Sequence, residues 1–224
     1  ELVKEGYTTC FSVGGGNIMH LAESASTRLD IIPVVHEATA VMAAEAFNAT
    51  AQDGGKAFVL VTTGPGLTNS ITGIAGAHLE AREVLVIGGQ VKTVDLSDGS
   101  IRQLGIQEID GVELTSSITL RSARMLSPWN SSKIQNFIRV SPFERPGPVF
   151  LEIPIDVQGR EFNKAESSDL AFSPDSTEVG RPAPEMQEVF KLLGESKRPV
   201  LLIGGGVSYN FAQKLEKSFL DCEI

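Results

Sequence analysis

The stretch that decides the fold is "KAFVLVTTGPGLTNSITGIAGAHLE", residues 56–80. Residues 56–63 predict a strand, because their centre, "AFVLV", is an unbroken apolar run of the kind found in sheets that are covered on both faces. A Gly-Pro-Gly turn at 64–66 ends the run, and small and apolar residues at 68–80 then predict a helix. A strand, a glycine turn and a helix in this order predict one unit of an α/β fold.

The same alternation continues on both sides of this stretch. Further apolar runs predict strands at 8–13, 30–35, 83–89 and 147–156, and helix candidates lie at 17–28, 37–50 and 130–139. Strands that alternate with helices predict a parallel central sheet with helices on both faces. Three of the strands end in glycine, and ligands of such folds bind beyond the carboxyl ends of the strands, where a residue without a Cβ permits close approach.

The chain is predicted to contain one domain, a linker and the beginning of another domain. Residues 1–157 carry the five strands and form the first domain, and residues 158–184 are polar and turn-rich, as in an interdomain linker. A second α/β pattern follows at 185–224, with helices at 185–194 and 208–219 and a strand at 199–206. One strand and two helices are too few for a domain, so we expect a truncated middle domain and a fragment of a longer protein.

Composition excludes several classes of function. The chain has 19 Lys and Arg against 28 Asp and Glu, a formal net charge of -9, which disfavours nucleic acid as a partner because such binding depends on basic residues. No apolar run approaches the roughly 20 residues of a membrane span, and the two cysteines form no CxxC motif. The three histidines have no metal-ligand spacing, so we predict no metal site in this chain. We expect a cytoplasmic protein with no membrane partner.

Glu37 is the first candidate functional residue, because it lies between an apolar strand and a helix of small residues, "HEATAVMAAEAF" at 36–47. One interpretation is an ordinary acid in the first helical turn, favoured by the helix dipole by about 0.3 to 1 kcal/mol. The other is a carboxyl group kept in dry surroundings as a catalytic acid or base. These residues alone leave both interpretations open.

The glycine-rich turns give weaker signals. In "TTGPGLTN" (62–69) no Lys follows the last glycine, as a Walker A motif requires, and Asn69 replaces the third glycine of a dinucleotide fingerprint. A flat, mostly apolar ligand lying against the backbone fits this turn equally well. "LLIGGGV" (201–207) predicts either a contact with nucleotide phosphates at the start of a helix or a tight connection from strand to helix.

Six motifs follow one another along the chain. They are "VGGGN" (13–17), "HEATAVMAAEAF" (36–47), "TTGPGLTN" (62–69), "GGQV" (88–91), "IQE" (106–108) and "RPGPVFLEIPIDV" (145–157). Together the motifs resemble the N-terminal pyrimidine-binding domain of thiamine diphosphate-dependent enzymes, in particular the acetolactate synthase-like group. Each motif alone would be weak, but the ordered set is highly specific, and residues 185–224 resemble the opening of the family's middle domain.

The resemblance implies thiamine diphosphate as the cofactor and Glu37 as the catalytic residue, hydrogen-bonded to N1′ of the aminopyrimidine ring. The cofactor-binding residues that it implies are Gly15, Gly16, Gly64, Pro65, Asn69, Gln107 and Arg145. Arg145 matches a position that contacts FAD in acetolactate synthases. The alternative for this residue is a salt bridge that fixes the turn before the last strand.

The resemblance also implies partners that this chain does not supply. In the family, Mg²⁺ and the diphosphate are held by a Gly-Asp-Gly motif in a third domain, and the site forms between subunits. FAD binds to the middle domain in acetolactate synthases. We therefore expect a homodimer or homotetramer that acts on a 2-oxo acid as a transferase or lyase, with the isolated chain inactive. The alternative function, from a different class, is a non-catalytic α/β binding or regulatory module.

Three departures from the family pattern limit the substrate prediction. Residues 46–49 are Ala-Phe-Asn-Ala where the family commonly has Gly-Tyr-Ala-Arg, Ile106 replaces a usual Phe, and Ile155 replaces a frequent Lys. The last two positions lie near the substrate entrance in acetolactate synthases. The resemblance therefore implies cofactor binding more strongly than formation of 2-acetolactate.

Overall fold

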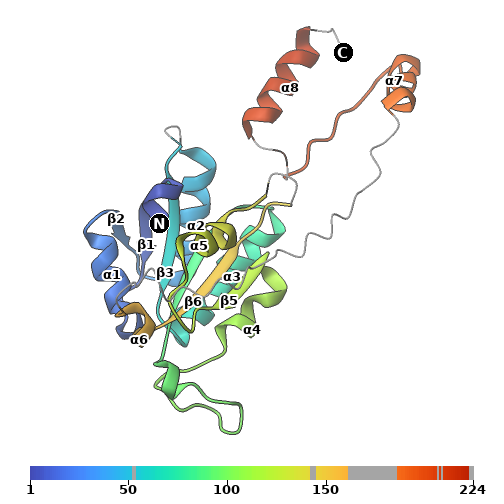
Figure 1. Ribbon diagram of the computed structural model, residues 1–224. Coiled ribbons are helices and arrows are strands. Elements are labelled where there is room, and N and C mark those ends of the chain that lie inside the picture. Colours follow the sequence, from blue (N-terminus) through green and yellow to red (C-terminus); the bar gives the residue numbers. More distant parts are fainter. Residues whose placement is uncertain (52–53, 142–144, 161–185, 206, 208, 222–224) are drawn as a thin grey trace. The chain divides into compact units, whose positions relative to one another are not determined.

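The computed structural model describes residues 1–51, 54–141, 145–160, 186–205, 207 and 209–221, which are drawn in colour in Figure 1. The chain divides into two units, Glu1–Ala171 and Phe172–Ile224. The first unit contains a six-stranded sheet with the order β2-β1-β3-β4-β6-β5. Its strands are β1 (Tyr7–Ser12), β2 (Asp30–Pro33), β3 (Lys56–Val61), β4 (Leu85–Gln90), β5 (Arg121–Arg124) and β6 (Val149–Pro154).

Every pair of neighbouring strands is parallel, so all six strands end at one edge of the sheet, here named the carboxyl edge, and begin at the other, the amino edge. The helices of this unit are α1 (Met19–Ser26), α2 (Glu37–Thr50), α3 (Pro65–Leu79), α4 (Gly111–Thr115), α5 (Ser131–Ile138) and α6 (Ile155–Gln158). Short 3₁₀ segments are η1 (Leu2–Glu5), η2 (Gly16–Ile18), η3 (Thr93–Asp95) and η4 (Ser116–Ile118). The predicted parallel sheet with helices on both faces is confirmed.

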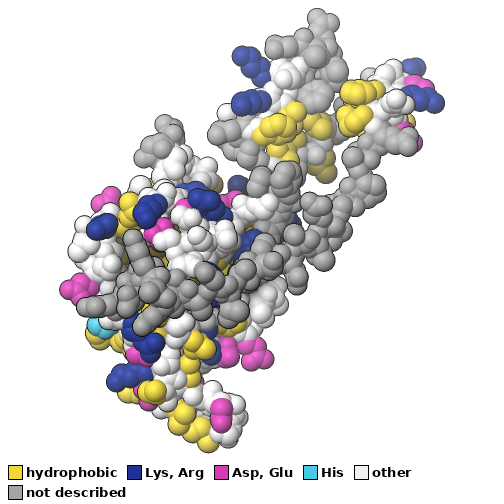
Figure 2. Space-filling model, viewed as in Figure 1, with side chains coloured by type: hydrophobic (Ala, Val, Ile, Leu, Met, Phe, Trp, Pro, Cys, Tyr) yellow, Lys and Arg dark blue, Asp and Glu magenta, His cyan; other side chains and the backbone are white. Residues whose placement is uncertain are grey.

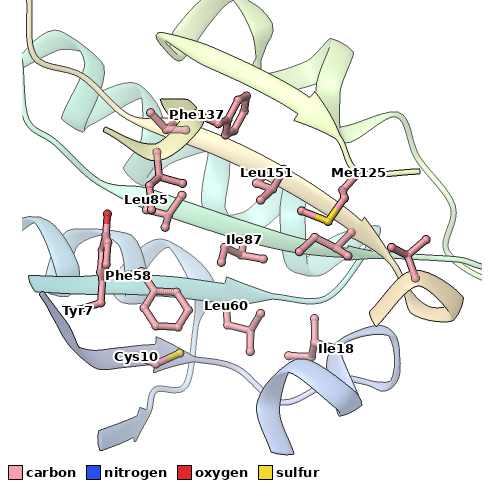
Figure 3. Packing of buried hydrophobic residues seen from close by; sticks show 14 residues of the cluster. Tyr7, Cys10, Ile18, Phe58, Leu60, Leu85, Ile87, Met125, Phe137 and Leu151 are labelled. Atoms are coloured by element: carbon pink, nitrogen blue, oxygen red, sulfur yellow. The ribbon is translucent and has the colours of Figure 1, made fainter. Parts of the chain in front are cut away.

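Successive residues of β3 alternate between two hydrophobic cores. Phe58 and Leu60 belong to the core that α1, α5 and α6 cover, whereas Val59 and Val61 belong to the core beneath α2 and α3. Figure 3 shows the first of these cores, in which Phe137 of α5 lies over the strands. A strand that is buried on both faces has no polar alternation, which explains the unbroken apolar run in its sequence.

The strand order has a switch point at the carboxyl edge, between β1 and β3. The chain runs outward from β1 to β2 and then returns to β3 on the other side of β1. The loops after β1 and β3 therefore leave the sheet on opposite faces and separate, which is where ligands bind in open α/β sheets. Figure 1 shows α2 and α3 together on one face, beside this point.

Residues 186–221 supply only part of the second predicted pattern. The predicted helices are present as α7 (Met186–Glu195) and α8 (Tyr209–Asp221). The strand expected at 199–206 is wrong in its described part, because residues 199–205 form no strand. The described residues of 186–221 also include no other strand that could complete the hydrogen bonds that a strand requires. The beginning of a second α/β domain is thus not shown.

The predicted linker, 158–184, falls outside the described residues from 161 onward, and Gln158 still belongs to α6. The predicted domain limits remain predictions. Within the described residues, none of the helices combines the length and the apolar character that crossing a membrane would require.

Candidate functional site

Three segments meet around Thr62 at the carboxyl edge. A Cβ atom added to Gly15, in the loop after β1, would lie 2.4 Å from the Cβ atom of Thr62. A Cβ atom added to Gly66, in the first turn of α3, would lie 2.8 Å from Cγ2 of the same residue. Glycine is therefore required at both positions for the segments to approach. Gly16 differs, because a Cβ atom there would meet no atom within 4 Å.

Glu37 is the first residue of α2 and is 7% exposed. The Nδ2 atom of Asn69, in α3, donates a hydrogen bond of 3.0 Å to its Oε2 atom. The second carboxylate oxygen, Oε1, would lie 3.5 Å from a Cβ atom at Gly66. One oxygen of the acid is thus held by Asn69, and the other lies beside a residue that has no side chain.

Local sequence fixes both helices that carry this pair. The Nδ1 atom of His36 accepts a hydrogen bond of 3.2 Å from the backbone N–H of Ala38, so His36 caps α2 and Glu37 begins it. Gly73 allows α3 to pack closely on α2, because a Cβ atom there would lie 2.5 Å from the Cβ atom of Val41. This close approach brings Asn69 within reach of Glu37.

Gly64 and Gln107 form a second close contact at the carboxyl edge. Gly64 has φ 66° and ψ -123°, and a Cβ atom there would lie 2.6 Å from the backbone oxygen of Gln107. Gln107 is itself left-handed, with φ 61°, and its side chain is exposed. Pro65 follows Gly64 as the first residue of α3, where a missing N–H group costs nothing. The predicted residues Gly15, Glu37, Gly64, Pro65, Asn69 and Gln107 are thus brought to one edge.

Beneath the Gly64 turn lies a polar cluster, the Gln90 network, which consists of Thr63, Gln90, Asp110, Arg124 and Glu152. Thr63, Gln90 and Glu152 are buried, whereas Arg124 is partly exposed and Asp110 is exposed. The Nε2 atom of Gln90 donates to Oε1 of Glu152 at 2.9 Å, and its Oε1 atom accepts from the hydroxyl group of Thr63 at 3.0 Å. Arg124 forms ion pairs with Glu152 and with Asp110. Burial raises the pKa of the Glu152 carboxyl, and the Arg124 guanidinium acts against this rise.

The long loop between β4 and α4 is organised by Glu108. Its carboxylate accepts hydrogen bonds from the backbone N–H groups of Ser97, Leu104 and Gly105. Burial acts to raise the pKa of Glu108, but these donors together lower it below the ordinary value. Figure 1 shows the loop projecting at the foot of the view, and hydrophobic side chains lie there in Figure 2. Its exposed apolar residues are Val94, Ile101, Leu104 and Ile106.

Arg145 is not brought to this site. Its guanidinium donates to the backbone oxygens of His78 and Leu79, at 2.8 and 3.1 Å, and so caps the carboxyl end of α3. Gly64 lies at the other end of that helix, about 20 Å away, and Asn69 lies about 14 Å from His78 along the helix axis. The alternative prediction was a salt bridge, whereas these acceptors are backbone carbonyl oxygens. The flavin contact remains a prediction.

Sequence reasoning assigned no role to any member of the Gln90 network. Thr63, Gln90 and Glu152 occur within quoted motifs, yet no role was predicted for them. The available signal is a polar residue inside an otherwise apolar strand, as Glu152 is in "VFLEIP". Such a residue must find a buried partner, because an unpaired polar group in a core costs several kcal/mol, on the order of 2 to 7.

Comparison with known proteins agrees with the geometry. Residues 1–114 match the family described as "Thiamine pyrophosphate enzyme, N-terminal TPP binding domain". The chain is 32% identical over 216 residues to the "Probable acetolactate synthase large subunit" of Methanocaldococcus jannaschii, with 92% of the chain and 34% of that protein covered. It is 30% identical over 226 residues to the "Acetolactate synthase large subunit" of Lactococcus lactis, with 99% and 38% covered.

A third relative gives the same proportion. The chain is 32% identical over 221 residues to the "Acetolactate synthase isozyme 2 large subunit" of Escherichia coli, covering 96% of the chain and 38% of that protein. The chain therefore spans little more than a third of the length of these relatives. The activity given in the names of these relatives therefore belongs to proteins much longer than this chain.

Proposed function

The chain belongs to the thiamine pyrophosphate enzymes, as their N-terminal TPP binding domain, and from this premise we propose that its carboxyl edge binds the aminopyrimidine ring of thiamine diphosphate. The observation that carries the proposal is the pairing of Glu37 and Asn69, in which one carboxylate oxygen is held and the other lies beside Gly66. An acid fixed in this way can present a single oxygen to a ring nitrogen.

The residues at this edge fit a flat ring. Gly15, Gly64 and Gly66 have no side chains, and a Cβ atom at each would overlap Thr62 or Gln107. Ligand sites contain a few well-placed polar groups that fix the orientation of the ligand. Glu37 supplies such a polar group from α2, on the side where α3 begins.

The chemistry of the cofactor resides in C2 of its thiazolium ring, a carbon that must lose a proton before it can attack a carbonyl group. In the proposed site, Oε1 of Glu37 would be the atom that holds a proton or gives it up to the ring nitrogen N1′. Asn69 keeps the carboxylate in one orientation, and burial of Glu37 limits exchange of this proton with water. The role of Glu37 is therefore that of an acid and base at one stated atom.

The activity proposed for the full-length protein is a carboligation or decarboxylation of a 2-oxo acid, like that of the acetolactate synthases that the chain resembles. We assign the diphosphate and its Mg²⁺ to another domain of the protein, and FAD to the middle domain. A homodimer or homotetramer belongs to the same proposal.

The test replaces Glu37 by Gln in the full-length protein and follows exchange of the C2 proton of bound thiamine diphosphate by NMR. We expect the exchange rate to fall by at least about 100-fold, because a positioned acid or base contributes roughly that much or more. Glu45→Gln is the matched control, since Glu45 lies two turns further along α2, away from the pair with Asn69. This variant should exchange at the wild-type rate.

Unchanged exchange in Glu37→Gln would contradict the catalytic assignment. Absence of thiamine diphosphate binding by the full-length wild-type protein would favour the alternative, a non-catalytic α/β binding or regulatory module.

A further inference from the structure

Every donor and acceptor of the Gln90 side-chain amide forms a hydrogen bond. Its Nε2 atom donates to Glu152 Oε1 at 2.9 Å and to the backbone oxygen of Ile109 at 2.8 Å. Its Oε1 atom accepts from Thr63 at 3.0 Å and from the backbone N–H of Val91 at 2.9 Å. An amide has two donor hydrogens and two acceptor lone pairs, so all are used, and the side chain is 0% exposed. Gln90 therefore fixes the orientation of its partners.

Thr63 connects this fixed group to the loop that contains Gln107. Its hydroxyl group lies 3.0 Å from Oε1 of Gln90 and 3.3 Å from the backbone oxygen of Gln107. A hydroxyl group carries one hydrogen, so the two acceptors share a single donor. Thr63 thus holds the backbone of Gln107 at one place, while Gln90 holds Ile109, two residues further along the loop.

The backbone of Gln107 requires such support. Its φ of 61° lies in the left-handed region, which residues with a side chain adopt rarely and only where the surroundings impose it. The surroundings here are the Gly64 turn, against which its carbonyl oxygen packs, and the hydroxyl group of Thr63. The Gln107 side chain is exposed at the carboxyl edge, whereas Thr63 and Gln90, which support its backbone, are buried.

We propose that Gln90 and Thr63 are positioning residues, which hold Gln107 in its left-handed conformation so that its side chain meets the cofactor at the edge that carries Glu37. The inference rests on the proposed function, because it assigns a purpose to the placement of Gln107. Arg124 completes the arrangement by neutralising Glu152, the acceptor that anchors the Gln90 amide.

The first test uses this chain and needs no cofactor. Thr63→Val removes the hydroxyl group with little change of shape, Thr63→Ser retains it, and Thr9→Val is the control, since Thr9 is a buried threonine in the amino half of β1. Hydrogen exchange of the amides at 105–109 should quicken roughly tenfold in Thr63→Val, as expected for loss of one hydrogen bond. It should stay near the wild-type rate in Thr63→Ser and in Thr9→Val. Unchanged exchange in Thr63→Val would overturn the proposal.

The second test uses the full-length protein with bound thiamine diphosphate. We expect C2-proton exchange to slow roughly tenfold in Thr63→Val and to recover in Thr63→Ser, while the Thr9→Val variant keeps the wild-type rate. Gln90→Met, which removes all four hydrogen bonds, should slow it further. Thr63→Val could quicken amide exchange in the loop and yet leave C2-proton exchange at the wild-type rate. Thr63 would then have only a structural role, and this result would also overturn the proposal.

Failure of the proposed function gives a different result. It would appear as unchanged C2-proton exchange in Glu37→Gln, which does not involve the Gln90 network. The exchange of the loop amides in the first test does not depend on that outcome.

Discussion

The two edges of the sheet differ in what they bury. At the carboxyl edge and in the adjoining half of the sheet, Glu37, Thr63, Gln90 and Glu152 are all buried, and each has a side-chain partner. At the amino edge, Arg139 pairs with Glu5, and the Arg139 side chain is 61% exposed, whereas that of Glu5 is 9% exposed. An open hollow at this edge is lined by polar and apolar residues, among them Tyr7, Arg28 and Asp30. The carboxyl edge thus gathers buried polar side chains that pair with one another, whereas the ion pair at the amino edge has one side chain in solvent.

The difference indicates where function constrains the fold. A charge pair at the surface remains hydrated and contributes little, whereas buried polar groups must be fully paired or they destabilise the protein. Stability alone does not explain why four such groups lie beside the glycine turns, because apolar residues of similar volume often stabilise a protein equally well. A site that requires fixed polar groups explains their position.

The largest effect should come from breaking the buried pair. Glu152→Ala removes the acceptor of both Gln90 and Arg124, and we expect the free energy of unfolding to fall by about 4 kcal/mol, as for other buried pairs that lose one member. Glu5→Ala removes the partner of Arg139 and should cost much less, because Arg139 is 61% exposed and stays hydrated without it. Urea denaturation of this chain measures both. Equal losses of unfolding free energy in Glu152→Ala and Glu5→Ala would contradict this difference between the two edges.

A second comparison uses two glycines with positive φ. Gly64→Ala should destabilise by about 3 kcal/mol, because its backbone region is almost confined to glycine and the new Cβ would overlap the backbone oxygen of Gln107. Gly6, just before β1, has φ 86° with no atom within 4 Å of an added Cβ. Gly6→Ala should therefore cost only about 1 kcal/mol. Thermal unfolding of both variants tests the difference, and a smaller loss in Gly64→Ala would contradict the close packing of the turn.

The smallest effect concerns pH. The folded-state pKa of Glu108 is lowered, so its contribution to stability is present above the ordinary value of 4.5 and is lost as the pH falls through the folded-state value. We expect the amides of Ser97, Leu104 and Gly105 to lose protection on acidification, after correction for intrinsic exchange. In Glu108→Gln the protection should be low at every pH. If the protection of these amides in the wild-type chain does not change with pH, this role of Glu108 is contradicted.

Much of the sheet could be predicted from the sequence because buried parallel strands have a simple signature. The run at 56–63 contains β3, and the helix at 37–50 coincides with α2, since the apolar and small residues there leave few alternatives. β5 was missed because "RSAR" contains no apolar run and its residues are only half buried. The helices α4 and α6 have five and four residues, too few for a helical pattern to show.

The site was predictable to the extent that it lies in local motifs. Glu37 and the glycines at 15, 64 and 66 stand at the ends of strands, where the fold class already places ligands. The Gln90 network was not predictable in this way, because Gln90 and Glu152 are 62 residues apart and meet only through the pairing of β4 with β6. For Arg145 the motif match predicts a contact with flavin, and the motif gave no sign of the capping of α3 that the structure shows; the flavin contact remains a prediction.

The most direct test of the account maps the binding of thiamine diphosphate onto the two edges. Hydrogen exchange of the full-length protein, with and without the cofactor and Mg²⁺, reports protection along residues 1–160. We predict new protection at 36–38, 62–69 and 105–109, on the carboxyl edge, and none at 6–8, 27–30 and 78–82, on the amino edge. Protection at the amino edge, or a bound cofactor with no change at 62–69, would contradict the account.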